Sequence, residues 1–568
     1  MIPSFTQCRP IVKYSDIEDC LINPPEWVKQ IQPLKERSSH IIKNALSDCH
    51  CTENTFRLRP RIDCRAAPKT LVCHDYKGGY QADSYVPFDN HEDKTLATDG
   101  YTFYNWSQVD YFVYFSHYFI TIPPLAWINA GHRNGVKVLG TIITENQDGV
   151  KICNEEIFNN HDQMKEFVYR LTEIQKIFGF DGWLLNIENT VQNPELLRDF
   201  VEILTLQTHL QNSENVIIWY DSVTKDGNLK WQDQLNNLNR CFFDCCDGIF
   251  LNYSWNEEKL ENTAALAGAR QFDVFVGVDV FGRNMFGGGQ FNTYKAAQII
   301  RKYNLSMAIF APGWTHETMT KTAEEADLCT FLNRDDALWA TLWPYLYTHP
   351  INNFFETDFH VGLDFNNYNL YIQKFQMSWV LSPEDLTSFA NNLQENISDC
   401  YCLKRAYWNS RNVCSISDEK LCAKNNSEKF IHRLFSCDIQ LSGRIGVFCL
   451  TKKLNVAEST IVDISMLTCY KSGSVRTIHL LGERKALPVD NSSCLEVAPL
   501  TDKEVIYNNY LNSIAKRFFK VLSKPKDRGC IILSMYEFTT TSCDLLEIGA
   551  TIRNGTTIHL IEFGIIQL

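Results

Sequence analysis

The sequence predicts an α/β fold, a (β/α)8 TIM barrel followed by a mainly β, sandwich-like C-terminal region. The first observation is a rhythm: between residues 70 and 312, short apolar runs alternate with segments of helical periodicity. Apolar strands that alternate with helices are typical of a parallel sheet covered on both faces. The second observation is that this rhythm stops after residue 350, where strand-like runs continue with few long amphipathic helices.

Eight apolar runs are the predicted barrel strands. Eight parallel strands with crossover helices make one closed barrel, whose active site lies at the carboxyl ends of the strands. A doubly wound open sheet is the alternative, but it needs a glycine-rich phosphate loop after an early strand, and none occurs there. The predicted strands are residues 71–75, 111–116, 136–144, 182–188, 216–223, 248–253, 274–280 and 307–312.

We expect two large domains and an extension, because 568 residues exceed one ordinary domain. Residues 1–66 are polar and interrupted by prolines, so we predict an N-terminal extension there. We assign residues 67–350 to the catalytic barrel and residues 351–568 to the β-sandwich-like region. Amphipathic patterns predict helices at residues 164–178, 383–396 and 505–518.

The composition and net charge restrict the partners. The chain is 45% hydrophobic and 21% charged, as folded globular proteins are, and its net charge is -13. That charge disfavours nucleic acid and polybasic membrane contacts. We expect no membrane span, because no run of 18 apolar residues occurs, and no secretory signal, because the first residues contain no apolar segment.

The cysteines favour a reducing compartment. The chain has 21 of them, an odd number, scattered and often inside apolar runs, so we expect reduced thiols and a cytosolic protein. Asn-x-Ser/Thr sequons occur, but Asn252 of one such sequon lies in a predicted strand, where a glycan does not fit. Cys49, His50, Cys51 and Cys64 fit no common zinc spacing, so we predict no metal and no cofactor.

The most informative motif ends the fourth predicted strand. Asn186 and Glu188 are two residues apart, so both side chains point to the same face of that strand. A rise of ~3.3 Å per residue puts them roughly 6–7 Å apart along it. An amide and a carboxylate at the end of a buried strand are typical of a catalytic pair at the mouth of a barrel. A hydrogen-bonded structural pair is the alternative.

Polar and aromatic residues also follow the other predicted strands. Tryptophan and tyrosine stack on the apolar faces of sugars, while carboxylates and amides bind the hydroxyl groups. Each aromatic residue alone is better explained by core packing or an ordinary loop position, but their number at one end of the barrel favours a carbohydrate cleft. The candidate substrate-binding residues are His74, Glu145, Trp183, Trp219, Trp231, Asn252, Trp255, Asp279, Phe281 and Trp314.

The amide beside Glu188 restricts the chemistry. Most glycosidases use two carboxylates, and asparagine is neither a strong nucleophile nor a base. A sugar with a 2-acetamido group supplies its own nucleophile, the carbonyl oxygen, and gives an oxazoline-type intermediate. Glu188 then acts as general acid and base, Asn186 orients the acetamide, and Tyr220 hydrogen-bonds the same group.

At these residues the chain resembles the endo-β-N-acetylglucosaminidases of glycoside hydrolase family 85, the cytosolic type. The resemblance covers roughly residues 68–400. It rests on ordered motifs at successive strands, which are residues 72–80, 132–141, 143–145, 180–189, 219–222, 250–253, 281–283 with the following triplet Gly287-Gly288-Gly289, and 311–314.

The resemblance implies hydrolysis between the two core N-acetylglucosamines of Asn-linked glycans or free oligosaccharides, with retention. It gives the assisting role to Asn186, the acid/base role to Glu188 and acetamide contact to Tyr220. Two positions depart from the usual pattern, Asn284 and His316, and both concern glycan-contacting loops. A glycan-binding protein without turnover and a chitinase-like enzyme are the alternatives, although chitinases usually carry Asp-x-Glu at the fourth strand.

Overall fold

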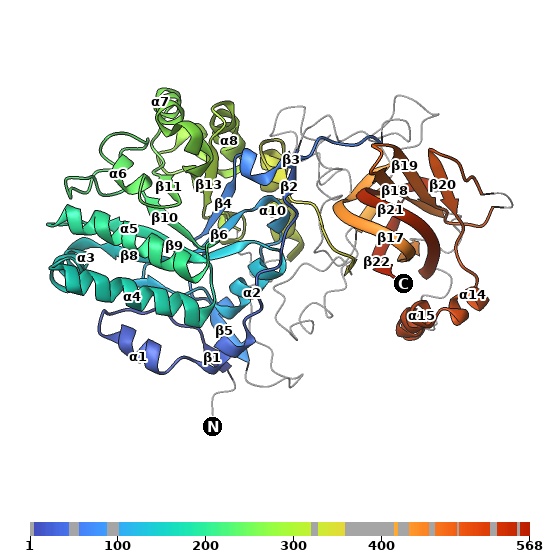
Figure 1. Cartoon of the computed structure of the whole chain (residues 1–568), viewed down its shortest axis with the longest axis horizontal. Coiled ribbons are helices and arrows are strands. Elements are labelled where there is room, and N and C mark those ends of the chain that lie inside the picture. Colours follow the sequence, from blue (N-terminus) through green and yellow to red (C-terminus); the bar gives the residue numbers. More distant parts are fainter. Residues whose placement is uncertain are drawn as a thin grey trace. The chain divides into compact units, whose positions relative to one another are not determined.

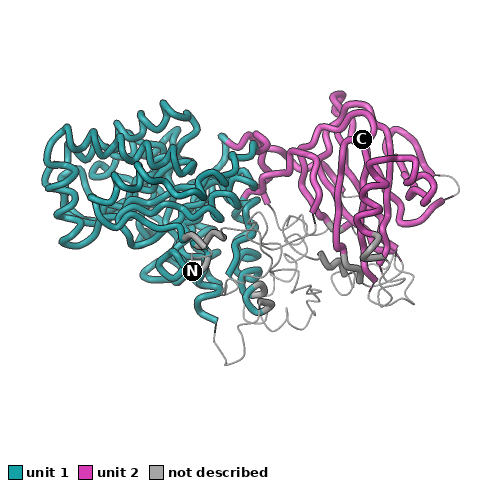
Figure 2. The backbone as a smooth tube through the Cα atoms, turned by 90° about the horizontal axis from the view of Figure 1, so that it is seen from below, with its two compact units in different colours: residues 1–36, 65–346, 363–370 teal, residues 37–64, 347–362, 371–568 magenta. Residues whose placement is uncertain are grey.

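The computed structural model describes ten segments of the chain, residues 5–44, 56–87, 101–319, 328–357, 414–417, 431–453, 461–485, 488–522, 531–553 and 557–568. The chain divides into two compact units (Figure 2). The first comprises residues 1–36, 65–346 and 363–370, and the second comprises residues 37–64, 347–362 and 371–568. Each unit has its own hydrophobic core.

The first unit is a closed parallel barrel (Figure 1). Neighbouring strands follow the order β6-β4-β13-β12-β11-β10-β9-β8, and β8 pairs again with β6. A short strand β7 (Ile120–Thr121) adds to β8 antiparallel. Each barrel strand overlaps one predicted strand, so the predicted fold class is confirmed. The barrel strands are β4 (Thr70–His74), β6 (Tyr111–Tyr114), β8 (Lys137–Glu145), β9 (Gly182–Glu188), β10 (Val216–Tyr220), β11 (Gly248–Leu251), β12 (Val274–Asp279) and β13 (Ser306–Phe310).

Helices follow the strands and cover the outside of the barrel (Figure 1). The long helix α4 (His161–Phe178) confirms the amphipathic prediction. It begins where the Asn160 side chain accepts two backbone N–H bonds, and it ends at Gly179, whose φ of 59° suits glycine. The other helices of this unit are α1 (Asp16–Ile22), α2 (Leu125–Arg133), α3 (Asn146–Lys151), α5 (Pro194–Gln211), α6 (Arg240–Phe243), α7 (Glu257–Ala267), α8 (Thr293–Lys302), α9 (Trp314–Glu317) and α10 (Leu328–Leu342).

The alternation along the strands separates two apolar layers. One buried cluster fills the barrel and includes Leu184, Ile218 and Tyr220. A larger cluster lies between the strands and the helices and includes Trp183 and Trp219. Because successive side chains of a strand point to opposite faces, neighbours in sequence enter different layers. This parity decides which candidate residues reach the mouth of the barrel.

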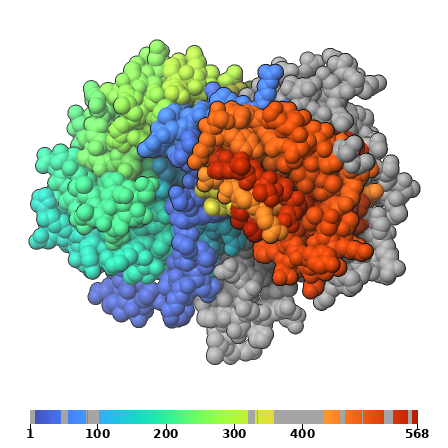
Figure 3. Space-filling model, turned by 45° about the vertical axis from the view of Figure 1, so that its right-hand side comes forward, coloured from blue at the N-terminus to red at the C-terminus, as the bar shows by residue number. Residues whose placement is uncertain are grey.

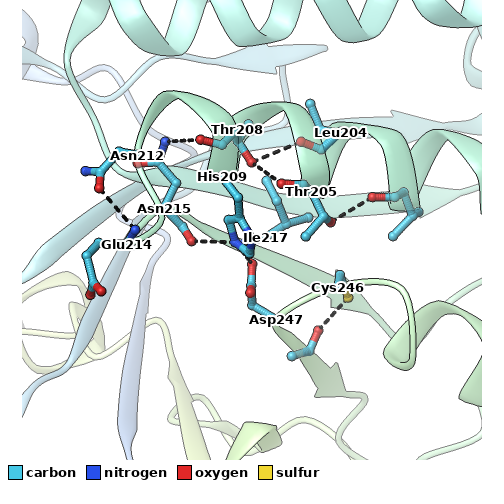
Figure 4. Close-up of polar contacts among 12 residues, drawn as sticks. Leu204, Thr205, Thr208, His209, Asn212, Glu214, Asn215, Ile217, Cys246 and Asp247 are labelled. Carbon is cyan, nitrogen blue, oxygen red and sulfur yellow. Dashed lines mark hydrogen bonds and ion pairs between the residues drawn. The ribbon is translucent and has the colours of Figure 1, made fainter.

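A polar network joins α5 to the amino ends of β10 and β11 (Figure 4). His209 Nε2 lies 3.0 Å from the Asn215 carbonyl and 3.1 Å from Asp247 Oδ2. Asp247 also accepts the backbone N–H of Ile217 at 2.8 Å. Burial raises the pKa of Asp247. The network lies at the amino ends of the strands, opposite to the end where barrel enzymes place their chemistry, so a structural role is expected.

The second unit is rich in β-structure (Figure 1). Its C-terminal residues, coloured orange to red, form one continuous region of the surface in Figure 3. Its main sheet has the order β15-β22-β17-β21-β18-β19-β20, and β16 pairs with β22. Two very long strands, β17 and β21, pair antiparallel with register shifts, where bulges bend a sheet. The strands are β15 (Phe355–Thr357), β16 (Cys414–Ser417), β17 (His432–Lys453), β18 (Ile461–Tyr470), β19 (Val475–Leu480), β20 (Cys494–Val497), β21 (Ile531–Arg553) and β22 (Thr557–Gln567).

Two helices, α14 (Asp502–Tyr507) and α15 (Asn509–Leu522), coincide with the helix predicted at 505–518. Residues 383–396, predicted as a helix, lie outside the described residues. Among the described residues, we find no helix that is both long enough and apolar enough to cross a membrane.

The predicted N-terminal extension is divided between the units. In the first unit, β1 (Phe5–Gln7) pairs with β5 (Tyr85–Pro87). In the second, β2 (His40–Lys43) pairs with β3 (Ile62–Asp63) and β14 (Tyr347–Thr348). Arg59 donates to Glu547 of β21 at 2.7 Å, and both side chains are almost fully buried. A buried charge needs an oppositely charged partner, and Arg59 has its partner in the second unit. Residues 37–64 are therefore part of that unit.

Candidate active site

Asn186 and Glu188 occupy the carboxyl end of β9 and share its inner face. Leu184, two residues earlier, belongs to the cluster inside the barrel, while Leu185 and Ile187 belong to the outer cluster. Asn186 is buried, and Glu188 is partly open at the mouth. The alternation inferred from the sequence thus holds through the whole strand.

Several groups around Glu188 set its protonation. Burial raises the pKa of Glu188 to about 7, and the carboxylate of Glu145 adds to this rise. Trp231 opposes it, because its indole Nε1 donates to Glu188 Oε1 at 3.3 Å, and a hydrogen bond with Asn186 acts in the same direction. A carboxyl group with a pKa near neutrality is suited to giving a proton and taking one back.

Trp231 reaches the site on a loop that follows β10. Asp221 holds this loop: its carboxylate accepts the N–H of Gln232 at 3.1 Å, the N–H of Asp233 at 2.7 Å and the side-chain N–H of Asn239 at 2.9 Å. Asp221 is fully buried, and burial raises its pKa to about 7. Trp231 itself is 43% exposed, so its ring is available to a ligand.

A chain of hydrogen bonds positions Tyr220 beside the pair. The Tyr220 hydroxyl donates to Asn252 Oδ1 at 2.8 Å, and Asn252 Nδ2 donates to Asp233 Oδ1 at 2.7 Å. Lys259 pairs with the other oxygen of Asp233 at 2.8 Å. Tyr220 belongs to the cluster inside the barrel, on the same face as Glu188, and Glu188 contributes to raising its pKa, although burial contributes more. Asn252 therefore fixes the ring of Tyr220 at the mouth.

Asp279 is the last residue of β12 and forms a salt bridge with Arg283, and Phe281 lies two residues after it. Arg283 donates two hydrogen bonds to the Asp279 carboxylate, from Nε at 2.7 Å and from Nη2 at 3.2 Å. Its guanidinium lies 5.2 Å from the centre of the Phe281 ring. Asp279 is buried, while Arg283 is largely exposed. Nearby, the glycine triplet 287–289 has positive φ throughout and packs against Gly282, as a close-packed loop does.

Five candidate residues do not reach the mouth, which corrects the prediction. His74 lies in the outer layer of the barrel, its ring 4.5 Å from Trp127 of α2, and burial lowers its pKa to about 3. The other four are buried tryptophans of the same layer, Trp183, Trp219, Trp255 and Trp314.

The reason is the parity of each strand and the turn after it. Trp183 and Trp219 differ in parity from Glu188 and Tyr220, so they point toward the helices, and Trp219 stacks on Phe242 at 4.2 Å. Trp255 stacks on Phe286, and its indole donates to the Gly277 carbonyl at 2.8 Å. Trp314 packs edge-on against Phe291 at 5.0 Å.

The sequence reasoning missed several polar residues that face the same end of the barrel. Asp221 and Asp233 organise the loop of Trp231 and the partner of Tyr220. His117, after β6, lies 3.7 Å from Glu145. Their positions were a weak signal, because none of them lies on the inner face of a predicted strand. His316, one of the two departures, hydrogen-bonds Tyr76 at 2.9 Å, and Asn284 has a positive φ of 52°.

Among the residues that the structure describes, no three histidine, cysteine, aspartate or glutamate side chains are grouped as around a metal ion. Cys49, His50 and Cys51 lie outside the described residues. Among the cysteines whose side chains the structure describes, which include Cys64, no disulfide is formed.

Comparison with known proteins agrees with this geometry. Residues 84–366 match the sequence model of the family described as glycosyl hydrolase family 85. The matched region, which holds seven of the eight barrel strands, belongs to this family. The match contains Asn186, Glu188, Tyr220 and Trp231, so the residues that meet at the mouth are part of the family's domain.

Three curated relatives illustrate the similarity to this family 85 chain. It is 44% identical to the cytosolic endo-beta-N-acetylglucosaminidase of Mus musculus, over 52% of this chain and 39% of the relative. It is 44% identical to that of Homo sapiens, over 52% and 38%. It is 42% identical to cytosolic endo-beta-N-acetylglucosaminidase 2 of Arabidopsis thaliana, over 60% and 47%. The chain spans less than half the length of these relatives.

A solved structure shares the fold of this family 85 chain. The glycoside hydrolase domain of Endo-D from Streptococcus pneumoniae superimposes with a TM-score of 0.58, covering 98% of this chain and 83% of that chain. The two are 15% identical, so this likeness concerns the fold.

Proposed function

We propose that the protein is an endo-β-N-acetylglucosaminidase that hydrolyses the bond between the two core N-acetylglucosamines of Asn-linked glycans. The observation that carries this proposal is the pair Asn186 and Glu188 on one inner face at the end of β9, with the Trp231 indole on Glu188. The family of the barrel and the names of its relatives support the same class of reaction.

The proposed mechanism is retaining and assisted by the substrate. Glu188, whose pKa is raised to about 7, gives its proton to the leaving glycosidic oxygen as the bond to the anomeric carbon breaks. The acetamide carbonyl oxygen of the substrate attacks the same carbon and forms an oxazolinium ion. Glu188, now ionised, takes a proton from water as that water adds to the anomeric carbon. The bond between this carbon and the acetamide oxygen breaks in the same step, so the acetamide is restored and the configuration is retained.

Asn186 and Tyr220 have the supporting roles. Asn186 is buried two residues before Glu188, where its amide orients the acetamide and stabilises the positive charge that develops on it. The Tyr220 hydroxyl, fixed by Asn252, contacts the same group. The exposed ring of Trp231 supplies a stacking surface for a sugar. Asp279 and Phe281 remain proposed substrate contacts at the mouth, where Glu145 lies beside Glu188.

The substrates that we propose are N-linked glycans, glycoproteins or free oligosaccharides, and the compartment is the cytosol. Several relatives carry the word cytosolic in their names, and no disulfide joins the cysteines whose side chains the structure describes, which suits a reducing compartment. No cofactor or metal is required by this mechanism, because acid, base and nucleophile come from Glu188 and the substrate.

Incubation with a high-mannose glycopeptide tests the proposal. We expect a peptide that keeps a single N-acetylglucosamine and a free oligosaccharide that ends in the other, both identified by mass. The Glu188→Gln variant is the control, and we expect its rate to fall by about 10²–10⁴-fold. Absence of the single-sugar peptide at high protein concentration would contradict the proposal. Activity on chitin oligosaccharides alone would favour a chitinase-like enzyme.

A further inference from the structure

We propose that Glu145 is a positioning residue for Glu188: its carboxyl group, set beside that of Glu188, keeps the proton on Glu188 before the reaction. This inference rests on the proposed function and adds a second carboxylate to it. The fourth strand has Asn186 where a second acid would stand, so the neighbouring strand supplies the negative charge.

The backbone sets the two carboxyl groups side by side. Glu145 and Glu188 are the last residues of β8 and β9, and they are direct partners in the register of these parallel strands. Neighbouring strands lie about 4.8 Å apart. Both side chains share a face with Ile143 and Leu184, which belong to the cluster inside the barrel. A hydrogen bond between the two carboxyl groups is among the interactions that act on Glu188.

The surroundings decide which carboxyl group keeps the proton. Glu145 faces a basic group, because His117 Nδ1 lies 3.7 Å from its Oε1, and 32% of its side chain is exposed to water. His117 also acts electrostatically on Asp75. The contact with His117 thus distinguishes the surroundings of Glu145 from those of Glu188.

Glu188 faces neutral groups on its other sides. These are the Trp231 indole, the Asn186 amide and the hydroxyls of Tyr220 and Tyr253. Two carboxylates so close together do not both ionise easily, and burial favours the protonated form of Glu188. Glu188 therefore starts the reaction as an acid at neutral pH, as its role requires.

The same pair helps the second half of the reaction. When Glu188 has given its proton to the leaving oxygen, two carboxylates face each other. Their repulsion favours return of a proton to Glu188, and the water that adds to the anomeric carbon supplies it. Glu145 touches neither reacting atom, so it acts through Glu188.

The Glu145→Gln variant tests the inference through its pH profile. Wild-type hydrolysis of the glycopeptide is expected to fall on the alkaline side as Glu188 loses its proton, with an apparent pKa near 7. Without the charge of Glu145, we expect this alkaline limb to move down by about one pH unit. We expect KM to stay near the wild-type value and kcat at pH 8 to fall roughly 10-fold, since one pH unit is a factor of ten. Hydrolysis of a preformed sugar oxazoline, whose leaving group needs no acid, should not show the shifted limb.

Two matched variants serve as controls. Glu145→Asp keeps the charge, so we expect its alkaline limb to lie closer to wild type. Glu214→Gln makes the same chemical change at the other end of β8, where Glu214 pairs with Lys137 at 3.1 Å. We expect its profile to match wild type. An unshifted limb in Glu145→Gln would overturn the inference, and so would a raised KM with unchanged kcat, which would make Glu145 a direct sugar contact.

A spectroscopic readout separates this inference from the proposed function. Because the Trp231 indole donates to Glu188, its fluorescence should report the ionisation of that carboxyl group. The difference in fluorescence between the protein and its Trp231→Phe variant is expected to titrate near pH 7 and lower in Glu145→Gln. Absence of the shift overturns the pairing, whereas absence of glycopeptide cleavage overturns the proposed function.

Discussion

The raised pKa of Glu188 suits acid catalysis, but it lowers the stability of the fold at neutral and alkaline pH. Burial and the charge of Glu145 raise its pKa to about 7 from an ordinary 4.5. Below pH 4.5 the carboxyl group is protonated in both the folded and the unfolded chain, so it costs nothing. Between pH 4.5 and 7 the unfolded chain ionises while the folded chain does not, and the free energy of unfolding falls; above pH 7 the loss is complete.

We therefore expect Glu188→Gln to stabilise the protein at alkaline pH. Glutamine keeps the shape of the side chain without a charge to bury. The Tm of the variant should exceed the wild-type Tm at pH 8, and the difference should shrink toward pH 4.5. Thermal unfolding followed by circular dichroism at both pH values checks this. Equal Tm values at pH 8 would show that Glu188 ionises freely in the folded chain.

Asn186 separates assistance from acid catalysis. Asn186→Ala removes the amide that orients the acetamide, so we expect hydrolysis of the glycopeptide to fall by about 10²–10³-fold. Because a sugar oxazoline already has the new bond, the variant should still use it as a donor to a peptide bearing one N-acetylglucosamine. Mass spectrometry of the products measures both reactions. Loss of both would assign Asn186 to the architecture of the site instead.

At the scale of elements, a buried carboxylate controls an exposed aromatic ring. The loop after β10 carries Trp231, and Asp221 holds its far part through three hydrogen bonds. The same loop brings Asp233 to Asn252 and so to Tyr220. Asp221 therefore positions both Trp231 and the hydrogen-bond partner of Tyr220.

Asp221→Asn should loosen this loop. The new NH₂ group faces donors where a carboxylate accepted, which leaves buried N–H groups unpaired at a cost of about 1–3 kcal/mol. We expect a lower Tm, a fall in kcat/KM of about 10-fold, the size of 1.4 kcal/mol, and altered Trp231 fluorescence. Unchanged glycopeptide kinetics would show that the loop orders itself without Asp221.

His209→Ala is the matched control for a structural loss away from the site. It removes the donor between the Asn215 carbonyl and Asp247 at the opposite end of β10 (Figure 4). We expect a similar fall in Tm with kcat/KM unchanged below the melting range. This comparison separates a positioning effect of Asp221 from a general loss of stability.

At the scale of the whole molecule, two cores form from interleaved parts of the chain. Residues 37–64 leave the first unit and join the sheet-rich unit, where Arg59 meets Glu547 and Arg433 lies 3.8 Å from the same carboxylate. Ser436 accepts a further hydrogen bond from Arg59 at 3.4 Å. The segment is thus held by a buried charged group in addition to strand pairing.

Arg59→Met should destabilise the second unit. Methionine fills similar space but leaves Glu547 with less compensation in a buried place, and breaking such a pair costs about 3–5 kcal/mol. We expect a lower unfolding midpoint in urea and faster proteolysis within residues 431–568, read by mass spectrometry. The double variant Arg59→Met with Glu547→Gln is the control, because it removes the unpaired charge and should recover part of the loss.

The sequence by itself determined the barrel and the chemistry of its fourth strand. Eight apolar runs with helical segments between them specify strands and helices through local periodicity, and Asn186 and Glu188 share a face because a strand alternates. The same alternation excludes Trp183 and Trp219 from the mouth, because each lies an odd number of residues from an inward-facing residue of its own strand.

Tertiary structure decided what periodicity does not encode. The contact of Trp231 with Glu188, the anchor at Asp221 and the pairing of Glu145 with Glu188 join residues between 12 and 43 positions apart. The union of Arg59 with Glu547 spans 488 positions. Such contacts depend on loop paths and on the closing of the barrel, where packing of the entire chain selects one arrangement among many that the local sequence allows.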